Sequence, residues 1–281
     1  MPKTAVGRLE PRYPLTQLVA RLLGSVRRMP RRRDQRRFGP GPYVLGLRRD
    51  EALWGRGFPF DLPAVAAVED LQLDRPVTML AGENGSGKST VLEAVAEAVG
   101  FGKQGGELER WGELPAVPRT VLRGALVPRL SETKPRNGYY LRAESFFNIA
   151  RLIDGDSPRS PDVSIYGGVR LHEQSHGESF LALAANRFGR EGLYLLDEPE
   201  AALSVSGQLA LLAVTARAAA AGAQFVIATH SPILLACPNA RVYELDESGV
   251  TTPAYDELQA VRLTRGFLEA PERYLRALHE D

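Results

Sequence analysis

Residues 82–90 read Gly-Glu-Asn-Gly-Ser-Gly-Lys-Ser-Thr, and this stretch decides the fold class. It fits the pattern G-x-x-x-x-G-K-[ST], in which a glycine-rich backbone wraps around phosphate groups. The apolar run Val77–Ala81 before it is typical of a buried strand, and Val91–Val99 after it is typical of a helix. A strand, a glycine turn and a helix N-terminus direct backbone N–H groups and the positive end of the helix dipole at one point. The sequence therefore predicts a phosphate-binding loop.

Every residue of this loop is a candidate ligand of a nucleotide. We expect Lys88 to reach the β- and γ-phosphates of ATP and the Ser89 hydroxyl to bind Mg²⁺. The other candidate nucleotide ligands are Gly82, Glu83, Asn84, Gly85, Ser86, Gly87 and Thr90. The alternative is a glycine-rich turn that matches the pattern by chance, and the flanking strand and helix patterns argue against it.

The composition of the chain excludes several classes of protein. With 281 residues and 44% hydrophobic residues, it suits one large domain or two small ones with an ample core. Cys237 is the only cysteine, so an internal disulfide is impossible and nothing indicates an oxidising compartment. No stretch approaches the roughly 18 uncharged apolar residues of a membrane span. The most apolar segment, Leu209–Ala223, contains Arg217 and reads as a packed helix. We therefore expect a cytoplasmic protein.

The first 37 residues differ from the rest in charge. They hold 11 Lys and Arg against two acidic residues, a net charge of +9, and the whole chain carries +1, so the remainder carries −8. Seven of the arginines lie between Arg27 and Arg37. We predict that residues 1–41 form a basic, disordered tail and that the folded domain spans residues 42–281. A solvated extension, an arm that binds nucleic acid or an anionic surface, and a targeting peptide stay open as interpretations.

Two further predicted strands lead into chemically active side chains. Leu193–Leu196 is an apolar run that ends in Asp197 and Glu198, about 110 residues after the glycine loop. Because ligands bind at the carboxyl ends of parallel strands, we expect Asp197 to join the Mg²⁺ shell and Glu198 to orient or deprotonate the attacking water. Phe225–Ala228 is another buried strand and leads into His230. We expect His230 to donate a hydrogen bond to the γ-phosphate and to hold the water; a structural histidine is the alternative.

A second helix start is also a candidate phosphate site. Residues 172–180 read His-Glu-Gln-Ser-His-Gly-Glu-Ser-Phe and precede a helix that is predicted to end near Phe188. Serine and glycine at a helix N-terminus can bind an anion, so Ser175 and Gly177 are candidate ligands of a nucleotide held by a partner subunit. The alternative is an ordinary N-cap by Ser175 with Glu178 completing a capping box, and this motif taken alone favours it.

Four motifs follow one another along the chain: the glycine loop, the helix start at residues 172–180, the strand that ends in Asp197 and Glu198, and the strand that leads into His230. In this order they resemble the ATP-binding-cassette ATPase fold. Residues 175–178, Ser-His-Gly-Glu, stand where that family usually has Ser-Gly-Gly-Gln, and Gln174 stands where leucine is usual. Residues 201–204, Ala-Ala-Leu-Ser, look like the loop that joins two heads across the family's dimer. Glu200 replaces the threonine that usually follows Asp-Glu-Pro in transporter cassettes.

Further motifs narrow the resemblance. Asp-Glu-Pro-Glu at residues 197–200 and Ala-Thr-His-Ser-Pro at residues 228–232 are similar to soluble AAA-type ATPases of the SMC, RecF and OLD group. The combination of residues 141–147, which read Leu-Arg-Ala-Glu-Ser-Phe-Phe, with residues 173–180 and 196–204 resembles one compact bacterial family within that group, over residues 42–280. The resemblance implies an α/β P-loop head with a mainly parallel sheet and a short helical lobe within residues 145–190. It also implies hydrolysis of ATP with Mg²⁺ and a head-to-head homodimer.

Two assignments depend on the resemblance alone. Cassette ATPases usually place a glutamine after the strand predicted here at Tyr139–Leu141, where this chain offers Glu144. Glu144 is a candidate Mg²⁺ ligand through water, or else a partner of Arg142. Phe58 and Phe60 are candidates for stacking on adenine, although core packing is the favoured interpretation of both.

Two rival functions stay open. The first is the nucleotide-binding subunit of a membrane transporter, against which Glu200 and the departures at residues 175–178 argue. The second is a scaffold that senses ATP, scarcely hydrolyses it and acts on a nuclease or another effector. Glu198 and His230 favour at least some turnover.

Overall fold

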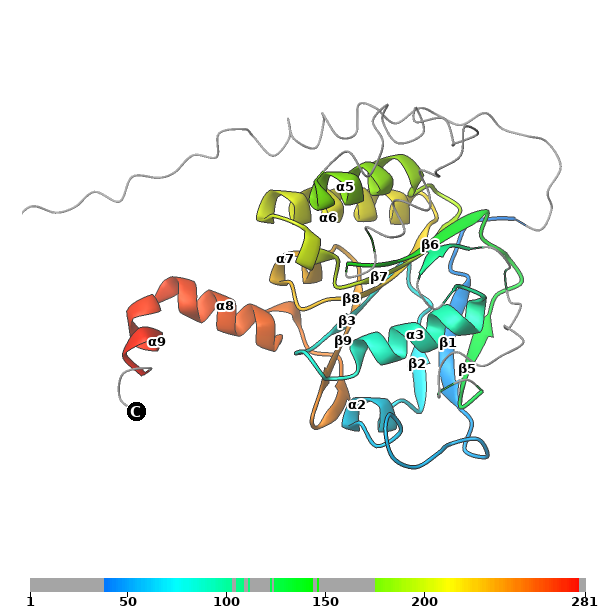
Figure 1. The fold of residues 1–281 in the computed structure, drawn as a ribbon, viewed down its shortest axis with the longest axis horizontal. Helices are drawn as coiled ribbons and strands as arrows, with labels where there is room; N and C mark the ends of the chain where they lie inside the picture. The colour runs from blue at the N-terminus through cyan, green and yellow to red at the C-terminus, as the bar shows by residue number, and fades with distance from the viewer. Residues whose placement is uncertain are drawn as a thin grey trace, which may run out of the picture.

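The computed structural model describes the larger part of the chain, namely residues 38–102, 105–108, 111, 122, 124–143, 146 and 175–277. The predicted basic tail up to residue 37, Glu144 and residues 147–174 of the predicted helical lobe lie outside the described residues. Within the described part, strands and helices build an α/β domain with a mainly parallel central sheet, as predicted (Figure 1).

The central sheet has seven strands in the described part of the chain. Five of them run parallel to their neighbours, and the antiparallel strands β10 and β4 lie at the two edges. In spatial order the strands are β10 (Gly249–Thr251), β9 (Arg241–Asp246), β3 (Val77–Ala81), β8 (Gln224–Ala228), β7 (Gly192–Asp197), β6 (Asn137–Arg142) and β4 (Gly106–Glu107). The strands that were predicted to carry the site are therefore neighbours in the middle of the sheet.

Helices cover both faces of this sheet (Figure 1). One face carries α5 (His176–Arg187), α6 (Val205–Ala220) and α7 (Pro232–Leu235), and the other carries α3 (Lys88–Val99). The predicted helix at Leu209–Ala223 thus begins four residues earlier, at Val205, because Ser204 accepts a hydrogen bond from Gly207 N and caps it.

Two hydrophobic clusters hold the layers together, and successive residues of the central strands alternate between them. Met79 and Phe225 pack under α5 and α6, whereas Leu80 and Val226 pack under α3. Parallel strands buried on both faces require such continuous apolar runs. Each fully buried side chain of this size contributes about 1.5–3 kcal/mol through removal of apolar surface from water.

A second sheet, which the sequence analysis did not predict, packs beside α3. It is antiparallel and consists of β2 (Asp70–Gln72), β1 (Val44–Arg49) and β5 (Leu126–Leu130) in that order. The buried Gln224 side chain at the start of β8 joins it to the central sheet. Its Oε1 accepts hydrogen bonds from Tyr43 N and Val44 N at 2.7 and 2.9 Å, and its Nε2 donates to Val44 O and Leu73 O at 2.8 and 2.7 Å.

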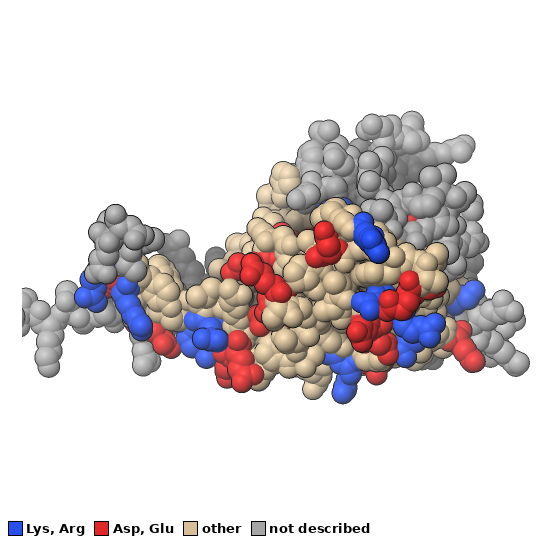
Figure 2. All heavy atoms as spheres, turned by 90° about the horizontal axis from the view of Figure 1, so that it is seen from below, with Lys and Arg blue, Asp and Glu red and all other residues tan. Residues whose placement is uncertain are grey.

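The remaining elements are short or lie at the C-terminal end. The helix α2 (Pro63–Ala66) is a single turn. After β10 come the 3₁₀ turn η4 (Tyr255–Glu257) and two helices that the sequence analysis did not resolve, α8 (Gln259–Glu269) and α9 (Pro271–Ala277). These two helices extend away from the body (Figures 1 and 2). Figure 2 shows acidic and basic side chains interspersed over the described part of one face. Among the described residues, no helix is long and apolar enough to cross a membrane.

Candidate nucleotide-binding site

Three neighbouring strands end at one edge of the central sheet and form the floor of the site. β8, which leads into His230, lies between β3, which leads into the glycine loop, and β7, which ends at Asp197. Backbone hydrogen bonds fix the strand ends to one another: Thr229 N donates to Leu80 O at 3.0 Å, and Glu198 N donates to Ala228 O at 2.9 Å. The carboxyl ends of parallel strands are the usual place for a ligand in such sheets.

The glycine loop connects β3 to α3 and approaches β9 closely. A Cβ on Gly82, which has φ of +141°, would lie 2.3 Å from Leu245 O, so only glycine fits there. Gly85 and Gly87 also have positive φ, and Gly87 is the N-cap of α3. No side chain caps α3, so the N–H groups of its first turn remain available to a ligand. This backbone therefore fits a phosphate chain.

Lys88 is the buried cation of the loop, with only 3% of its side chain exposed. Its Nζ donates a hydrogen bond to Glu83 O at 2.8 Å and lies 3.6 Å from Glu198 Oε1. A buried ammonium is unfavourable unless it has such partners. The side chain therefore links the tip of the loop to the carboxylate that follows β7.

Ser89 and Asp197 meet directly, as the predicted Mg²⁺ site requires. Ser89 Oγ donates to Asp197 Oδ1 at 2.8 Å. Burial raises the pKa of the Asp197 carboxyl, while the hydrogen bond from Ser89 and the charge of Arg142 act in the opposite direction. Hydroxyl and carboxylate oxygens are the donors that Mg²⁺ prefers. The two residues therefore fit a Mg²⁺ ion in the chemistry of their oxygen donors.

Sequence reasoning missed an ion-pair network behind Asp197. Arg142 Nε lies 3.5 Å from Asp197 Oδ2, and its Nη1 donates to Glu93 Oε1 at 2.6 Å. Burial disfavours the charged form of Arg142, yet Tyr140, Glu93 and Asp197 raise its pKa above the ordinary value. Arg142 was considered only as a partner of Glu144. The signal that would have identified it is its position as the last residue of β6, at the same sheet edge as Asp197.

Glu198 and His230 are the more exposed members of the site, at 31% and 48% of the side chain. His230 Nδ1 lies 3.9 Å from Glu198 Oε1. Glu198 has φ of +48°, a left-handed conformation that is uncommon for a residue with a side chain and costs on the order of 1–3 kcal/mol. The local backbone thus directs the Glu198 carboxylate away from the strand and toward Lys88 and His230.

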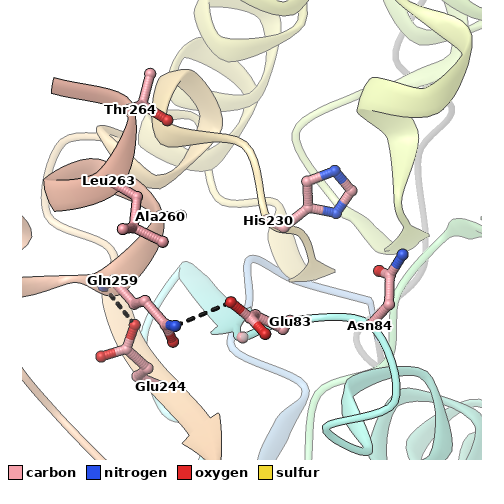
Figure 3. Close-up of a pocket in the computed structure, with 9 residues that line it drawn as sticks. Glu83, Asn84, His230, Glu244, Gln259, Ala260, Leu263 and Thr264 are labelled. Atoms are coloured by element: carbon pink, nitrogen blue, oxygen red, sulfur yellow. Dashed lines mark hydrogen bonds between the residues drawn. The ribbon is translucent and has the colours of Figure 1, made fainter. Parts of the chain in front are cut away.

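A cavity of about 450 Å³ opens between the glycine loop and α8. Figure 3 shows Asn84 and His230 on one side of it and Ala260, Leu263 and Thr264 of α8 on the other. Gln259 anchors the helix there, because its Nε2 donates to Glu83 Oε1 at 2.9 Å and its N donates to Glu244 Oε1 at 2.8 Å. The sequence did not predict that α8 lines the cavity, because the helix itself was not predicted.

Comparisons with known proteins agree with this geometry. Residues 64–110 match the AAA domain family. Over 213 residues the chain is 28% identical to the cytochrome c biogenesis ATP-binding export protein CcmA of Salmonella typhi, an alignment that covers 73% of this chain and 96% of CcmA. Over 174 residues it is 31% identical to a predicted ABC transporter ATP-binding protein of Streptomyces avermitilis, which covers 57% of this chain but only 30% of that protein's length.

The chain is a P-loop ATPase that is similar in sequence to ATP-binding-cassette proteins. Among solved structures, the SMC head domain from Thermotoga maritima is 14% identical, with a TM-score of 0.42, over 76% of this chain and all of that domain.

In this ATPase, Ser175 and Gly177 lie at the exposed start of α5. Both partners of the capping box are present: Glu178 N donates to Ser175 Oγ at 3.4 Å, and Ser175 N donates to Glu178 Oε2 at 3.1 Å. A Cβ on Gly177 would lie 2.8 Å from Ala202 O, so α5 packs closely against the 3₁₀ turn η3 (Pro199–Ala202). The structure therefore contains the plain N-cap, and a role toward a partner's nucleotide stays a prediction.

The two aromatic candidates for stacking on adenine differ in their exposure to solvent. Phe60 is buried and packs edge-on against Trp54, with ring centroids 5.2 Å apart, which agrees with the core interpretation. The core interpretation is wrong for Phe58, whose residue surface is 75% exposed. Cys237 is buried and free.

Proposed function

We propose that this ATPase binds two ATP molecules between two copies of itself and hydrolyses them slowly, with the dimer closing on ATP and opening after hydrolysis. The observation that carries the proposal is the hydrogen bond between Ser89 and Asp197. It supports a Mg²⁺ site, because a hydroxyl and a carboxylate oxygen meet there next to the glycine loop and Glu198. In such an arrangement an ATP γ-phosphate would lie among the loop, Lys88 and the end of β8.

The residues would divide the work as follows. The backbone N–H groups of residues 82–90 bind the phosphate chain, and Lys88 leaves Glu83 O to contact the β- and γ-phosphates. Ser89 and Asp197 would hold Mg²⁺, which neutralises charge on the phosphate oxygens. Glu144 remains a candidate for a water-mediated contact to the same ion.

Water attack on the γ-phosphate requires one group to orient the water and another to hold the phosphate. Glu198 has the exposure and the position, 3.6 Å from Lys88 Nζ, to accept a hydrogen bond or a proton from that water. His230 donates a hydrogen bond to the γ-phosphate from the end of β8. Stabilisation of the developing charge by these preorganised groups would be the main catalytic contribution.

The dimer would complete each site with the start of α5 from the second copy. Ser175 is exposed, and a helix start with serine and glycine suits a partner's γ-phosphate. Each copy would supply one glycine loop and one α5 start, so two nucleotides would be enclosed.

The test is sedimentation of Glu198→Gln with and without Mg-ATP. We expect this variant to bind ATP, to lose turnover by on the order of 10²–10³-fold, and to sediment as a dimer only with ATP, because it cannot hydrolyse the nucleotide. Glu247→Gln, which makes the same change at an exposed glutamate between β9 and β10, is the matched control and should behave like wild type. A Glu198→Gln protein that is monomeric under both conditions would contradict the dimer, and one with wild-type turnover would remove Glu198 from the mechanism.

A second candidate function is the ATP-binding subunit of a membrane transporter. The names of the Salmonella and Streptomyces relatives favour it, whereas Glu200 and the sequence at residues 175–178 favour a stand-alone cytoplasmic ATPase. Purification from native membranes and cytosol separates the two: co-purification with an integral membrane protein supports the transporter, and a soluble effector or nucleic acid supports the stand-alone protein.

A further inference from the structure

Glu200 is a buried carboxylate next to His230 that the mechanism above does not use. Its side chain is 5% exposed, and it lies in η3, directly after Glu198 and Pro199. One oxygen, Oε1, accepts hydrogen bonds from Thr229 Oγ1 at 2.6 Å and from His230 N at 2.7 Å. The same oxygen lies 3.4 Å from His230 Nδ1. Every one of these contacts is with the segment that carries His230.

This carboxylate is unfavourable for stability unless its contacts compensate for its burial. A carboxylate removed from water needs hydrogen bonds to offset the lost hydration. Oε1 has them, but Oε2 is also buried and has no hydrogen-bond partner in the part of the chain that the structure describes. Buried polar atoms without a partner are uncommon and call for an explanation, of which a role in function is one.

The contacts of Glu200 fix the backbone around His230 from one side. Thr229 Oγ1 accepts a hydrogen bond from Ser231 N at 3.0 Å, so its own hydrogen points to Glu200. From the other side, Ser231 Oγ caps α7 by accepting from Ile233 N and Leu234 N, each at 3.2 Å. His230 is thus the exposed residue between two anchored neighbours.

We propose that Glu200 is a positioning residue that holds His230 in the orientation required for contact with the γ-phosphate. With Nδ1 turned toward Glu200, Nε2 is the nitrogen that remains for the phosphate. Because Glu200 is buried, it acts through His230 and not on the substrate. This inference rests on the proposed function, in which His230 binds the γ-phosphate.

The experiment is a double-mutant cycle between Glu200 and His230, read as kcat and as affinity for Mg-ATP. We expect Glu200→Ala to lower kcat between about 10- and 100-fold, the range expected when a catalytic group is misplaced, with little change in nucleotide affinity. Glu200→Gln keeps an acceptor oxygen for Thr229 and His230 N, so it should restore kcat to within a few fold of wild type. In the His230→Ala background, Glu200→Ala should lower kcat little further, because residues that act together are not additive.

The cycle distinguishes this inference from a purely structural role and from the proposed function. A kcat loss of the same size with and without His230 would overturn it, since Glu200 would then act independently of His230. Unchanged kcat in Glu200→Ala, with reduced kcat in His230→Ala, would overturn it and leave the proposed function intact. Unchanged kcat in His230→Ala would overturn this inference and remove His230 from the proposed mechanism, while ATP-dependent dimerisation of Glu198→Gln would still test the rest of the proposed function. If Glu200→Ala does not fold, Thr229→Val removes one of the two hydrogen bonds to Oε1 and should lower kcat only where His230 is present.

Discussion

Two helices of this ATPase begin with sequences that suit phosphate, yet their first turns are built differently. α3 begins after Gly87 without a side-chain cap, and the buried Lys88 and the Ser89 hydroxyl lie in its first turn. α5 begins with a complete capping box on the surface, in which Ser175 Oγ both accepts from Glu178 N and donates to Glu178 Oε2 at 2.6 Å. The first helix start is prepared for an anion, whereas the second already binds one of its own side chains.

The difference shows that a helix N-terminus is not by itself a phosphate site. The hydrogen bonds from Ser175 lower the pKa of the Glu178 carboxyl, so the group is negatively charged at neutral pH. A phosphate that approaches α5 is repelled by this charge. It must also compete with the Glu178 carboxylate for the hydrogen bond that the Ser175 hydroxyl donates. At α3 the nearby charges are those of Lys88 and of the carboxylates of Asp197 and Glu198 at the end of β7, an arrangement suited to Mg-ATP.

The largest expected effect is on nucleotide binding at α3. Lys88→Ala should weaken ATP binding on the order of 10²-fold or more, because it removes the buried cation of the loop and leaves the phosphate charge without its closest partner. Lys134→Ala is the matched control, since it removes the same charge between β5 and β6 and should bind ATP like wild type. Titration with a fluorescent ATP analogue is the measurement. Equal affinity of Lys88→Ala and wild type would show that the start of α3 is not the nucleotide site, and the contrast between the starts of α3 and α5 would then be wrong.

A substitution at α5 should separate dimerisation from binding. Ser175→Arg places a bulky side chain at the start of α5, where the partner's nucleotide would lie. We expect it to abolish the ATP-dependent dimer in the Glu198→Gln background and to leave ATP affinity unchanged. Ser248→Arg, at an exposed serine after β9, controls for the added charge. If the Ser175→Arg protein still dimerises with ATP, Ser175 serves only as the N-cap of α5 and does not contact a partner's nucleotide.

A milder change at α5 tests whether the charge of Glu178 opposes the binding of a partner's phosphate. Glu178→Gln removes the negative charge from the helix start but keeps an acceptor for Ser175 N. In the Glu198→Gln background we expect it to strengthen the ATP-dependent dimer several-fold, about the effect of one favourable or unfavourable charge near a helix end. Acidification from pH 8 to 6 should not reproduce the effect in the Glu198→Gln protein that retains Glu178, because the lowered pKa keeps Glu178 charged over that range. Weaker dimerisation of Glu178→Gln would show that the capping box supports the interface.

The sequence predicted the parts of the site that are continuous in the chain. The run Val77–Ala81, the glycine loop and the carboxylate at the end of β7 were all located correctly, because buried parallel strands and glycine turns have strong local patterns. The pattern also placed Ser89 and Asp197 at one sheet edge, and the structure brings them within 2.8 Å.

The parts that were missed depend on contacts between distant segments. The pairing of Arg142 with Glu93 and Asp197, and the position of α8 against Glu83, arise only when the sheet order is known. The three-stranded sheet was missed for the same reason, since its central strand β1 pairs with β5, which lies more than 70 residues further along the chain. Glu200 could be noticed as an unusual residue, but only the fold shows its contact with the segment that carries His230.

The smallest effect on catalysis should come from removing residues 1–37, which belong to neither helix start. Every candidate catalytic residue lies from Gly82 onward, so the truncated protein should keep wild-type turnover in the absence of nucleic acid. The segment carries +9 against −8 for the rest of the chain, and we expect it to add sequence-independent affinity for nucleic acid. Each phosphate that its arginines contact releases counterions, so the log of affinity for duplex DNA should fall with the log of salt concentration by about 0.9 per contact. The measurement is DNA affinity of the full-length and truncated proteins over a salt series. If both bind equally weakly with the same salt slope, the segment has no such role, and nucleic acid loses its support as a partner.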